Sequence, residues 1–200
     1  MNRTIARFAL FGLAYVIPLA HLAAQGTAAP QGAPDPWYSR QARPQNVDEP
    51  KTFTGAFRIE LPKNWHFAPG HTGTIFSVVE HTKKWETGGL ITLEYMRLQL
   101  SLEPALIPGV GERELKEVQS RELSGKQFSG SIKNGPLGPI IFIQYDRPGI
   151  SGTDDHVVQY SIPVGTTMYR LICIAPTAEI EKYRPMFAHV AYSFSPMKQG

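Results

Sequence analysis

Two apolar segments restrict the fold more than any other feature of this chain. Residues 139–146 (PIIFIQYD) and 167–174 (TMYRLICI) carry large apolar side chains at both sets of alternate positions, so strands formed by them present apolar surface on both faces. The connections at 147–155 and 163–166 are too short to contain a crossover helix, and neighbouring strands must therefore run antiparallel. Both faces of the resulting sheet need a covering layer.

Two segments with helical periodicity supply these layers. Residues 112–123 place Leu115, Val118 and Leu123 on one side, and Gly125 stands where the helix should end. The flexible pair Gly109 and Gly111 leads into this helix. Residues 177–191 form the second helical segment, in which Pro185 predicts a kink or a break into two short helices. Its shared apolar face consists of Ile180, Tyr183, Phe187, Val190 and Ala191.

The remaining strands precede and follow the first helix. Residues 57–61 alternate apolar and charged side chains and stop at Pro62, and apolar runs follow at 74–79 and 90–95. We expect these three strands to form a meander. Residues 127–133 and a turn at 134–135 come after the helix. The predicted fold class is α+β: an α/β/α sandwich with a mostly antiparallel central sheet of about six to seven strands and two covering helical segments.

The N-terminus has the features of a secretory signal peptide. Arg3 and Arg7 precede an apolar run at 8–20 that is too short to span a membrane, and small residues at 21–24 offer a cleavage site. We therefore predict a signal peptide at 1–24 and no stable membrane insertion after its cleavage. Residues 25–52 are rich in Pro and Gln and predict a flexible tether. A single domain at 53–195 and a disordered tail at 196–200 complete the chain, which is expected in the periplasm or outside the cell.

The net charge limits the kinds of partner that are expected, and the cysteine content limits the chemistry. Removing the two arginines of 1–24 from the 20 basic residues leaves 18 against 17 acidic ones, a net charge of +1. No basic stripe remains, so nucleic acid is not expected as a partner. Cys173 is the only cysteine and lies in an apolar segment, which predicts a buried, inert thiol.

Two short signatures resemble the PsbP-like family. They are the phrase at 57–65 (FRIELPKNW) and the final segment, where 183–187 (YRPMF) is followed by 192–194 (YSF). The resemblance covers about residues 53–195. It implies an α/β/α sandwich around an antiparallel sheet and roles in binding rather than catalysis, as in photosystem subunits, a small Ran-binding protein, secretion adaptors and envelope lipoproteins. It carries over no catalytic motif.

Two loops are candidates for ligand or partner binding. The loop at 81–89 combines His81, Lys83, Lys84 and Trp85, a mixture of charge and aromatic surface typical of recognition sites, although a solvated hairpin explains it as well. The loop at 149–156 ends in Asp154, Asp155 and His156. With Ser151 it contains a nucleophile, a base and a carboxylate, but it lacks the strand-to-helix elbow of a hydrolase, and Gly and Asp also suit a hairpin loop.

Other candidates have weaker patterns. His66, His71 and His81 could bind zinc with Glu80, but their spacing matches no zinc motif. Trp65 follows a strand-ending proline and is expected to seal the edge of the core. We predict no catalytic residue, metal ligand or cofactor.

The function predicted from the sequence is an exported, non-enzymatic binding or accessory module of the bacterial cell envelope, acting on an unknown protein or small ligand. The alternative is an exported hydrolase or metal-dependent enzyme that uses His and Asp residues of the loops. A photosystem-associated subunit is a third reading, which only the family resemblance suggests.

Overall fold

The computed structural model of the 200-residue chain describes residues 51–53, 57–69, 72–80 and 88–197. The predicted signal peptide and the tether up to residue 50 lie outside these ranges. The strands are β1 Lys51–Phe53, β2 Phe57–Ile59, β3 Trp65–Ala68, β4 Thr74–Glu80, β5 Leu90–Arg97, β6 Lys126–Gly135, β7 Gly138–Pro148, β8 Asp154–Val164, β9 Thr167–Pro176 and β10 Ser195–Pro196. The helices are the short 3-10 turns η2 Pro104–Leu106 and η3 Thr177–Glu179, with α1 Ile107–Arg121 and α2 Ile180–Ser193.

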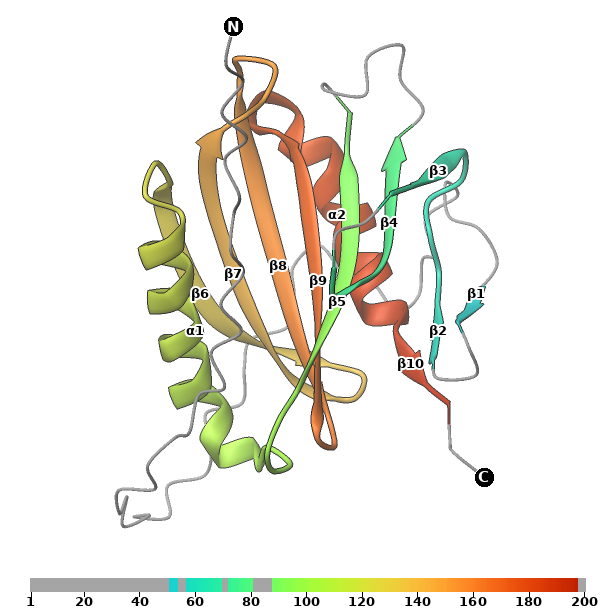
Figure 1. Ribbon diagram of the computed structural model, residues 1–200, viewed down its shortest axis with the longest axis vertical. Coiled ribbons are helices and arrows are strands. Elements are labelled where there is room, and N and C mark those ends of the chain that lie inside the picture. Colours follow the sequence, from blue (N-terminus) through green and yellow to red (C-terminus); the bar gives the residue numbers. More distant parts are fainter. Residues whose placement is uncertain (1–50, 54–56, 70–71, 81–87, 198–200) are drawn as a thin grey trace, which may run out of the picture.

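The central sheet contains seven described strands in the order β3-β4-β5-β9-β8-β7-β6 (Figure 1). Every neighbouring pair is antiparallel. Strands β6 to β9 follow one another as a meander, and β5 joins them beside β9. The sequence prediction of a six- to seven-stranded antiparallel sheet is confirmed, because short hairpins connect the two-sided apolar strands β7 and β9 through β8.

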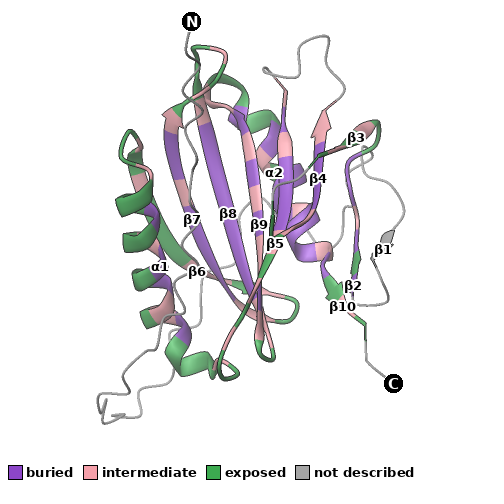
Figure 2. Ribbon diagram, viewed as in Figure 1, coloured by how far each residue is buried: buried purple, intermediate pink, exposed green. Residues whose placement is uncertain are grey.

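The two faces of the sheet have separate apolar layers. On one face, α2 packs over a core that includes Leu93, Tyr160 and Leu171, all at most 1% exposed. On the other face, α1 covers a smaller core containing Ile143 and Val157. Figure 2 shows the buried middle of the sheet and the exposed outer side of α1. The predicted α/β/α sandwich is therefore confirmed, and Cys173 is a fully buried free thiol whose pKa burial raises well above its ordinary value.

Helix α1 begins earlier and ends earlier than the periodicity indicated. It starts at Ile107, so the expected flexible lead-in at 109–111 is wrong and those residues are helical. Pro108 stands in the first turn, where its missing N–H costs nothing. A Cβ on Gly111 would lie 3.3 Å from Ile132 and Ile141, so the glycine lets the helix approach the sheet. Leu123 lies beyond the helix and is 89% exposed, which contradicts its predicted burial.

The predicted three-strand meander is wrong in its first member. Strand β2 pairs with β1 and β10 in a separate three-stranded sheet, with Phe57 opposite Pro196. The meander consists instead of β3, β4 and β5, and β3 was not predicted because its residues alternate poorly between polar and apolar. Between β2 and β3 the chain turns at Asn64, whose φ is 62°. The burial of Phe57 and Ile59 was nevertheless predicted correctly, since both pack in the α2-side core.

Helix α2 is one helix from Ile180 to Ser193 with Pro185 inside it. Of the two predicted effects of Pro185, a kink or a break into two short helices, the break is therefore wrong. The proline removes one backbone hydrogen bond, but eight buried side chains along the helix outweigh this cost by packing on the sheet and on β2.

Candidate functional site

The loop between β7 and β8 is held in shape by its own hydrogen bonds. The Gly149 N–H donates to the Thr153 carbonyl over 2.8 Å, and the hydroxyls of Ser151 and Thr153 are 2.8 Å apart. Gly152 adopts a φ of +82°, which favours glycine. The loop presents Ile150, which is 80% exposed. An apolar side chain is therefore exposed at the tip of a hydrogen-bonded turn, which the polar residues of this loop did not predict.

Asp154 and Asp155 follow the loop at the start of β8. Asp154 is exposed and pairs across the hairpin with Pro148. Asp155 is half-buried, and its carboxylate lies so close to Gly149 that a Cβ there would be 2.6 Å from the nearer oxygen. Burial raises the pKa of Asp155, Arg147 lowers it, and Asp154 raises it further. The two carboxylates therefore lie at the base of the loop that exposes Ile150, with Asp155 against Gly149.

His156 points into the protein rather than joining this surface. Its Nδ1 lies 2.6 Å from Asp146 Oδ1, and its Nε2 lies 3.2 Å from Arg184 Nη2. The residue is 8% exposed. Burial lowers the pKa of His156, while the hydrogen bond to Asp146 raises it and the Arg184 charge lowers it. Both ring nitrogens are engaged, so the imidazole connects the sheet to α2.

Arg184 extends this interior cluster along α2. Its Nη1 donates to Gln144 Oε1 over 2.9 Å, and its Nε donates to Glu181 Oε1 over 2.8 Å. The combination of Ser151, Asp154, Asp155 and His156 weighed from the sequence is not assembled: Ser151 bonds Thr153 within the loop, whereas His156 bonds Asp146. The predicted hairpin loop at 149–156 is confirmed as a hairpin connection, but it is shorter than predicted, because residues 154–156 belong to β8.

The second predicted binding segment contains His81, Lys83, Lys84 and Trp85, which lie outside the described residues. Its two flanks are described. Glu80 ends β4, and its carboxylate accepts hydrogen bonds from the Tyr183 hydroxyl and, over 3.3 Å, from the Gly89 N–H. Burial and the bond to Glu80 raise the pKa of Tyr183. Glu80 and Gly89, the residues that flank the connection, are thus linked through the Glu80 carboxylate to Tyr183 of α2.

Both predicted binding segments leave the sheet at the same end. Leu90 begins β5 and pairs with Ile174 of β9, which also pairs with Val157 near the start of β8. Pro148 ends β7 and pairs with Asp154 at the start of β8. The start of β5, the start of β8 and the end of β7 therefore lie at one end of the sheet. In Figure 1 the β7–β8 loop and the ends of β4 and β5 are at the top of the view. The midpoint between β4 and β5 and the midpoint between β8 and β7 are three strand spacings apart, which is about 14 Å.

A second buried polar cluster lies on the α1 side of the sheet. Glu114 is 4% exposed, and its Oε1 accepts hydrogen bonds from Gln159, Ser161 and Arg170 over 2.9, 2.9 and 2.7 Å. Among the described residues, its Oε2 has no hydrogen-bond partner. The Arg170 side chain is 16% exposed and balances the charge. This cluster joins α1 to β8 and β9, and it was not predicted from the sequence.

Trp65 and one of the three histidines considered for zinc are among the described residues. Trp65 packs against the α2-side core, as predicted, and its ring forms a T-shaped pair with the ring of Tyr183. Of the three histidines considered for zinc, His66 lies on β3, and His71 and His81 lie outside the described residues. Within the described ranges no group of three His, Cys, Asp or Glu side chains is placed to hold a metal ion. Neither α1 nor any other described helix has the length and apolar character needed to cross a bilayer.

Comparison with known proteins bears on the fold. No family model matches the sequence, and no curated protein matches it significantly. The solution structure of cyanobacterial PsbP (CyanoP) from Synechocystis sp. PCC 6803 is similar, with a TM-score of 0.56 at 12% identity, over 90% of this chain and 99% of that chain.

Two other solved structures are more distant. One is a crystal structure from Bacteroides thetaiotaomicron, with a TM-score of 0.47 at 12% identity over 72% of this chain and 46% of that chain. The other is LpqN, involved in cell envelope biogenesis of Mycobacterium tuberculosis, with a TM-score of 0.48 at 12% identity over 70% and 83%. The order of elements, the seven-stranded antiparallel sheet and the similarity to cyanobacterial PsbP together show that this chain has a PsbP-like fold.

Proposed function

We propose that the protein is an exported, non-enzymatic binding or accessory module of the bacterial cell envelope. The observation that carries this proposal is the shared sheet end from which both predicted binding segments leave a rigid scaffold. Loops held by a rigid sheet are common sites of recognition. The signal peptide predicted at 1–24 supports export, and the PsbP-like fold is compatible with this role.

The proposed recognition surface contains Ile150, Asp154 and Asp155 at the β7–β8 loop, and it lies at the sheet end where β4 ends and β5 begins. An exposed apolar side chain beside two carboxylates provides one anchor and a charged rim, which is the usual composition of a protein interface. Lys83, Lys84 and Trp85, which the sequence predicts to bind, belong to the connection between β4 and β5. The partner is accordingly a protein with an apolar pocket and basic neighbours facing the β7–β8 loop.

An Ile150→Asp variant tests this surface. The mature chain is used as bait in envelope extract of the source organism, and recovered proteins are quantified by mass spectrometry. We expect the variant to lower recovery of a specific partner by tenfold or more, since a central apolar anchor typically contributes 2 kcal/mol or more. Leu100→Asp is the matched control, because Leu100 is 69% exposed and follows β5 at the opposite sheet end.

Two outcomes contradict the proposal. If the wild-type chain recovers no specific partner, or if Ile150→Asp recovers it as well as the Leu100 control does, the β7–β8 loop is not the recognition surface. Export is tested separately by the intact mass of the protein from the periplasmic fraction, which we expect to start near residue 25. A protein that retains residues 1–24 in the cytoplasm contradicts the envelope role.

A further inference from the structure

Strand β6 forms one edge of the central sheet. Within the described residues it pairs only with β7, and its central residues Ser129, Gly130 and Ser131 are exposed. The strand is ten residues long and contains no proline. Lys133 does not shield the edge, because its ammonium lies 5.2 Å from the centre of the Phe142 ring. A long edge strand with small central side chains is a template for pairing with another strand.

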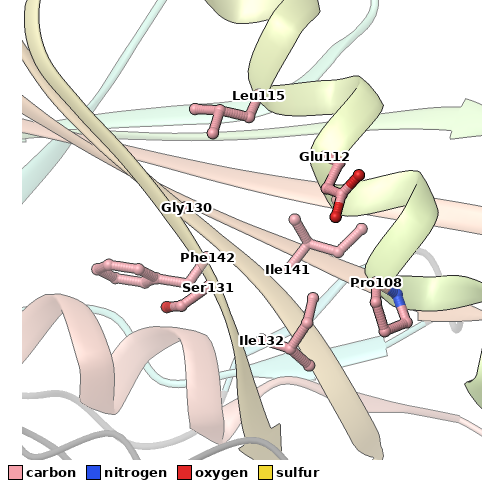
Figure 3. Close-up of a pocket in the computed structure, with 9 residues that line it drawn as sticks. Pro108, Glu112, Leu115, Gly130, Ser131, Ile132, Ile141 and Phe142 are labelled. Atoms are coloured by element: carbon pink, nitrogen blue, oxygen red, sulfur yellow. The ribbon is translucent and has the colours of Figure 1, made fainter. Parts of the chain in front are cut away.

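A groove of about 200 Å³ runs between this edge and α1 (Figure 3). Pro108, Glu112 and Leu115 line it from the helix, and Ile132 lines it from the strand. Helix and strand are close at this point, since a Cβ on Gly130 would be 3.2 Å from Leu115. A strand added to β6 would therefore lie beside a mostly apolar wall.

We propose that β6 pairs with β6 of a second copy of this chain, antiparallel and with the two-fold axis at Gly130. This register places Ser129 opposite Ser131 of the second copy. The register of β6 shifts between Lys126 and Ser129, where Gln127 has a φ of 55°, so the regular pairing extends from Phe128 to Ile132. This stretch contains no lysine, and no lysine therefore faces a lysine within it. The side chains of two antiparallel β6 strands centred on Gly130 are thus compatible in size and charge.

The position of α1 favours a second copy over an unrelated strand. Helix α1 packs on both β6 and β7, and in the proposed dimer we place its axis over the line between them. With strands about 4.8 Å apart, the two-fold axis brings the two α1 axes to about 10 Å from each other, close to the 8–10 Å of packed helices. Since Leu115 lies over Gly130, it would face Leu115 of the second copy. One symmetry operation would extend the sheet and fill both grooves.

The alternative two-fold axis at Ile132 is less favourable. Gly111 lies over Ile132, so this axis would bring the neighbouring Glu112 close to Glu112 of the second copy. Like charges at this distance oppose association. The charges on α1 therefore select the register centred on Gly130. This interface lies at the side edge of the sheet and does not depend on the recognition surface proposed at the sheet end.

Sedimentation equilibrium of the mature chain tests the association. We expect a monomer–dimer equilibrium, and we expect Leu115→Arg to weaken it by at least tenfold because two guanidinium groups would meet at the axis. Leu123→Arg is the matched control, since it makes the same change at an exposed position beyond α1 and should leave the dimer intact. A chain that stays monomeric at about 100 µM, or a Leu115→Arg variant that dimerises like the control, overturns the proposal.

A cross-link tests the register without relying on the Leu115 variant. Ser129→Cys and Ser131→Cys chains are prepared separately and oxidised, alone and mixed. In the proposed register these positions face each other across the axis at a separation that suits a disulfide. We expect the mixture to form a disulfide-linked dimer at least tenfold faster than either chain alone. Equal rates, or β6 amides that become protected only when envelope proteins are added, mean that β6 does not pair with itself.

Discussion

A Glu114→Ala variant is expected to lower the free energy of unfolding by about 3–5 kcal/mol, the usual cost of breaking a buried ion pair from one side. The carboxylate is 4% exposed and accepts three hydrogen bonds through one oxygen. Without it, the Arg170 guanidinium, whose side chain is 16% exposed, loses the acceptor that lies 2.7 Å from its Nε. Urea denaturation followed by circular dichroism measures the loss.

Replacing both charged partners should cost much less than replacing one. In a Glu114→Leu, Arg170→Met double variant no buried charge is left without a partner, and we expect a change within about 1 kcal/mol of wild type. Glu114 Oε2 lacks a hydrogen-bond partner among the described residues, so part of its desolvation is uncompensated in the wild type. The double variant removes that cost.

Glu117→Ala is the matched control, because Glu117 is an exposed glutamate of the same helix. Its effect should stay within about 0.5 kcal/mol. If Glu114→Ala also changes stability by less than 1 kcal/mol, the Glu114 cluster does not hold α1 to the sheet. If the double variant is as unstable as the single one, the hydrogen bonds of Gln159 and Ser161 account for the loss instead of the ion pair.

The sheet was predictable because its main determinants are local. Two-sided apolar strands and short connections left an antiparallel arrangement as the consistent one. The Glu114 cluster was missed because its partners lie 45 to 56 residues away, beyond any helical period. One signal was present: Arg170 interrupts an apolar strand, and a charge there requires a buried partner. The sequence could not identify that partner without the packing of α1.

The pairing of His156 could have been derived from the hairpin. Pro148 and Asp154 close the β7–β8 loop, so counting two residues outward on each strand gives Asp146 opposite His156. Sequence proximity instead grouped His156 with Asp154 and Asp155. Neighbouring positions alternate between faces in a strand, and this rule separates His156 from Asp155. Strand register therefore predicts the partner of a polar residue better than its sequence neighbours do.

The wild-type protein is expected to lose stability as the pH falls from about 6.5, and His156 should cause part of this loss. Burial lowers the pKa of His156 below its ordinary value of 6.5, so the unfolded chain binds a proton in a range where the folded chain does not. The contribution of the neutral imidazole is complete above pH 6.5 and declines below it. One proton corresponds to a slope of at most about 1.4 kcal/mol per pH unit.

A His156→Gln variant isolates this contribution. We expect the stability difference, wild type minus variant, to be largest near pH 8, where the neutral imidazole bonds Asp146, and to shrink between pH 6.5 and 5. Urea unfolding at half-unit pH steps gives this difference. Arg184→Gln should make the acid loss in the wild-type background smaller, because Arg184 lowers the pKa of His156.

The opposite pH trend in this stability difference would indicate a different protonation state for His156 beside Asp146. If the difference between wild type and His156→Gln grows as the pH falls, His156 is protonated in the folded protein and forms an ion pair with Asp146. The 2.6 Å separation between Nδ1 and Oδ1 fits both a neutral donor and an imidazolium. The Arg184 guanidinium lies 3.2 Å from Nε2, and a cation at this distance disfavours a second positive charge on the ring. We therefore expect a neutral imidazole that accepts a hydrogen bond at Nε2 and donates one from Nδ1.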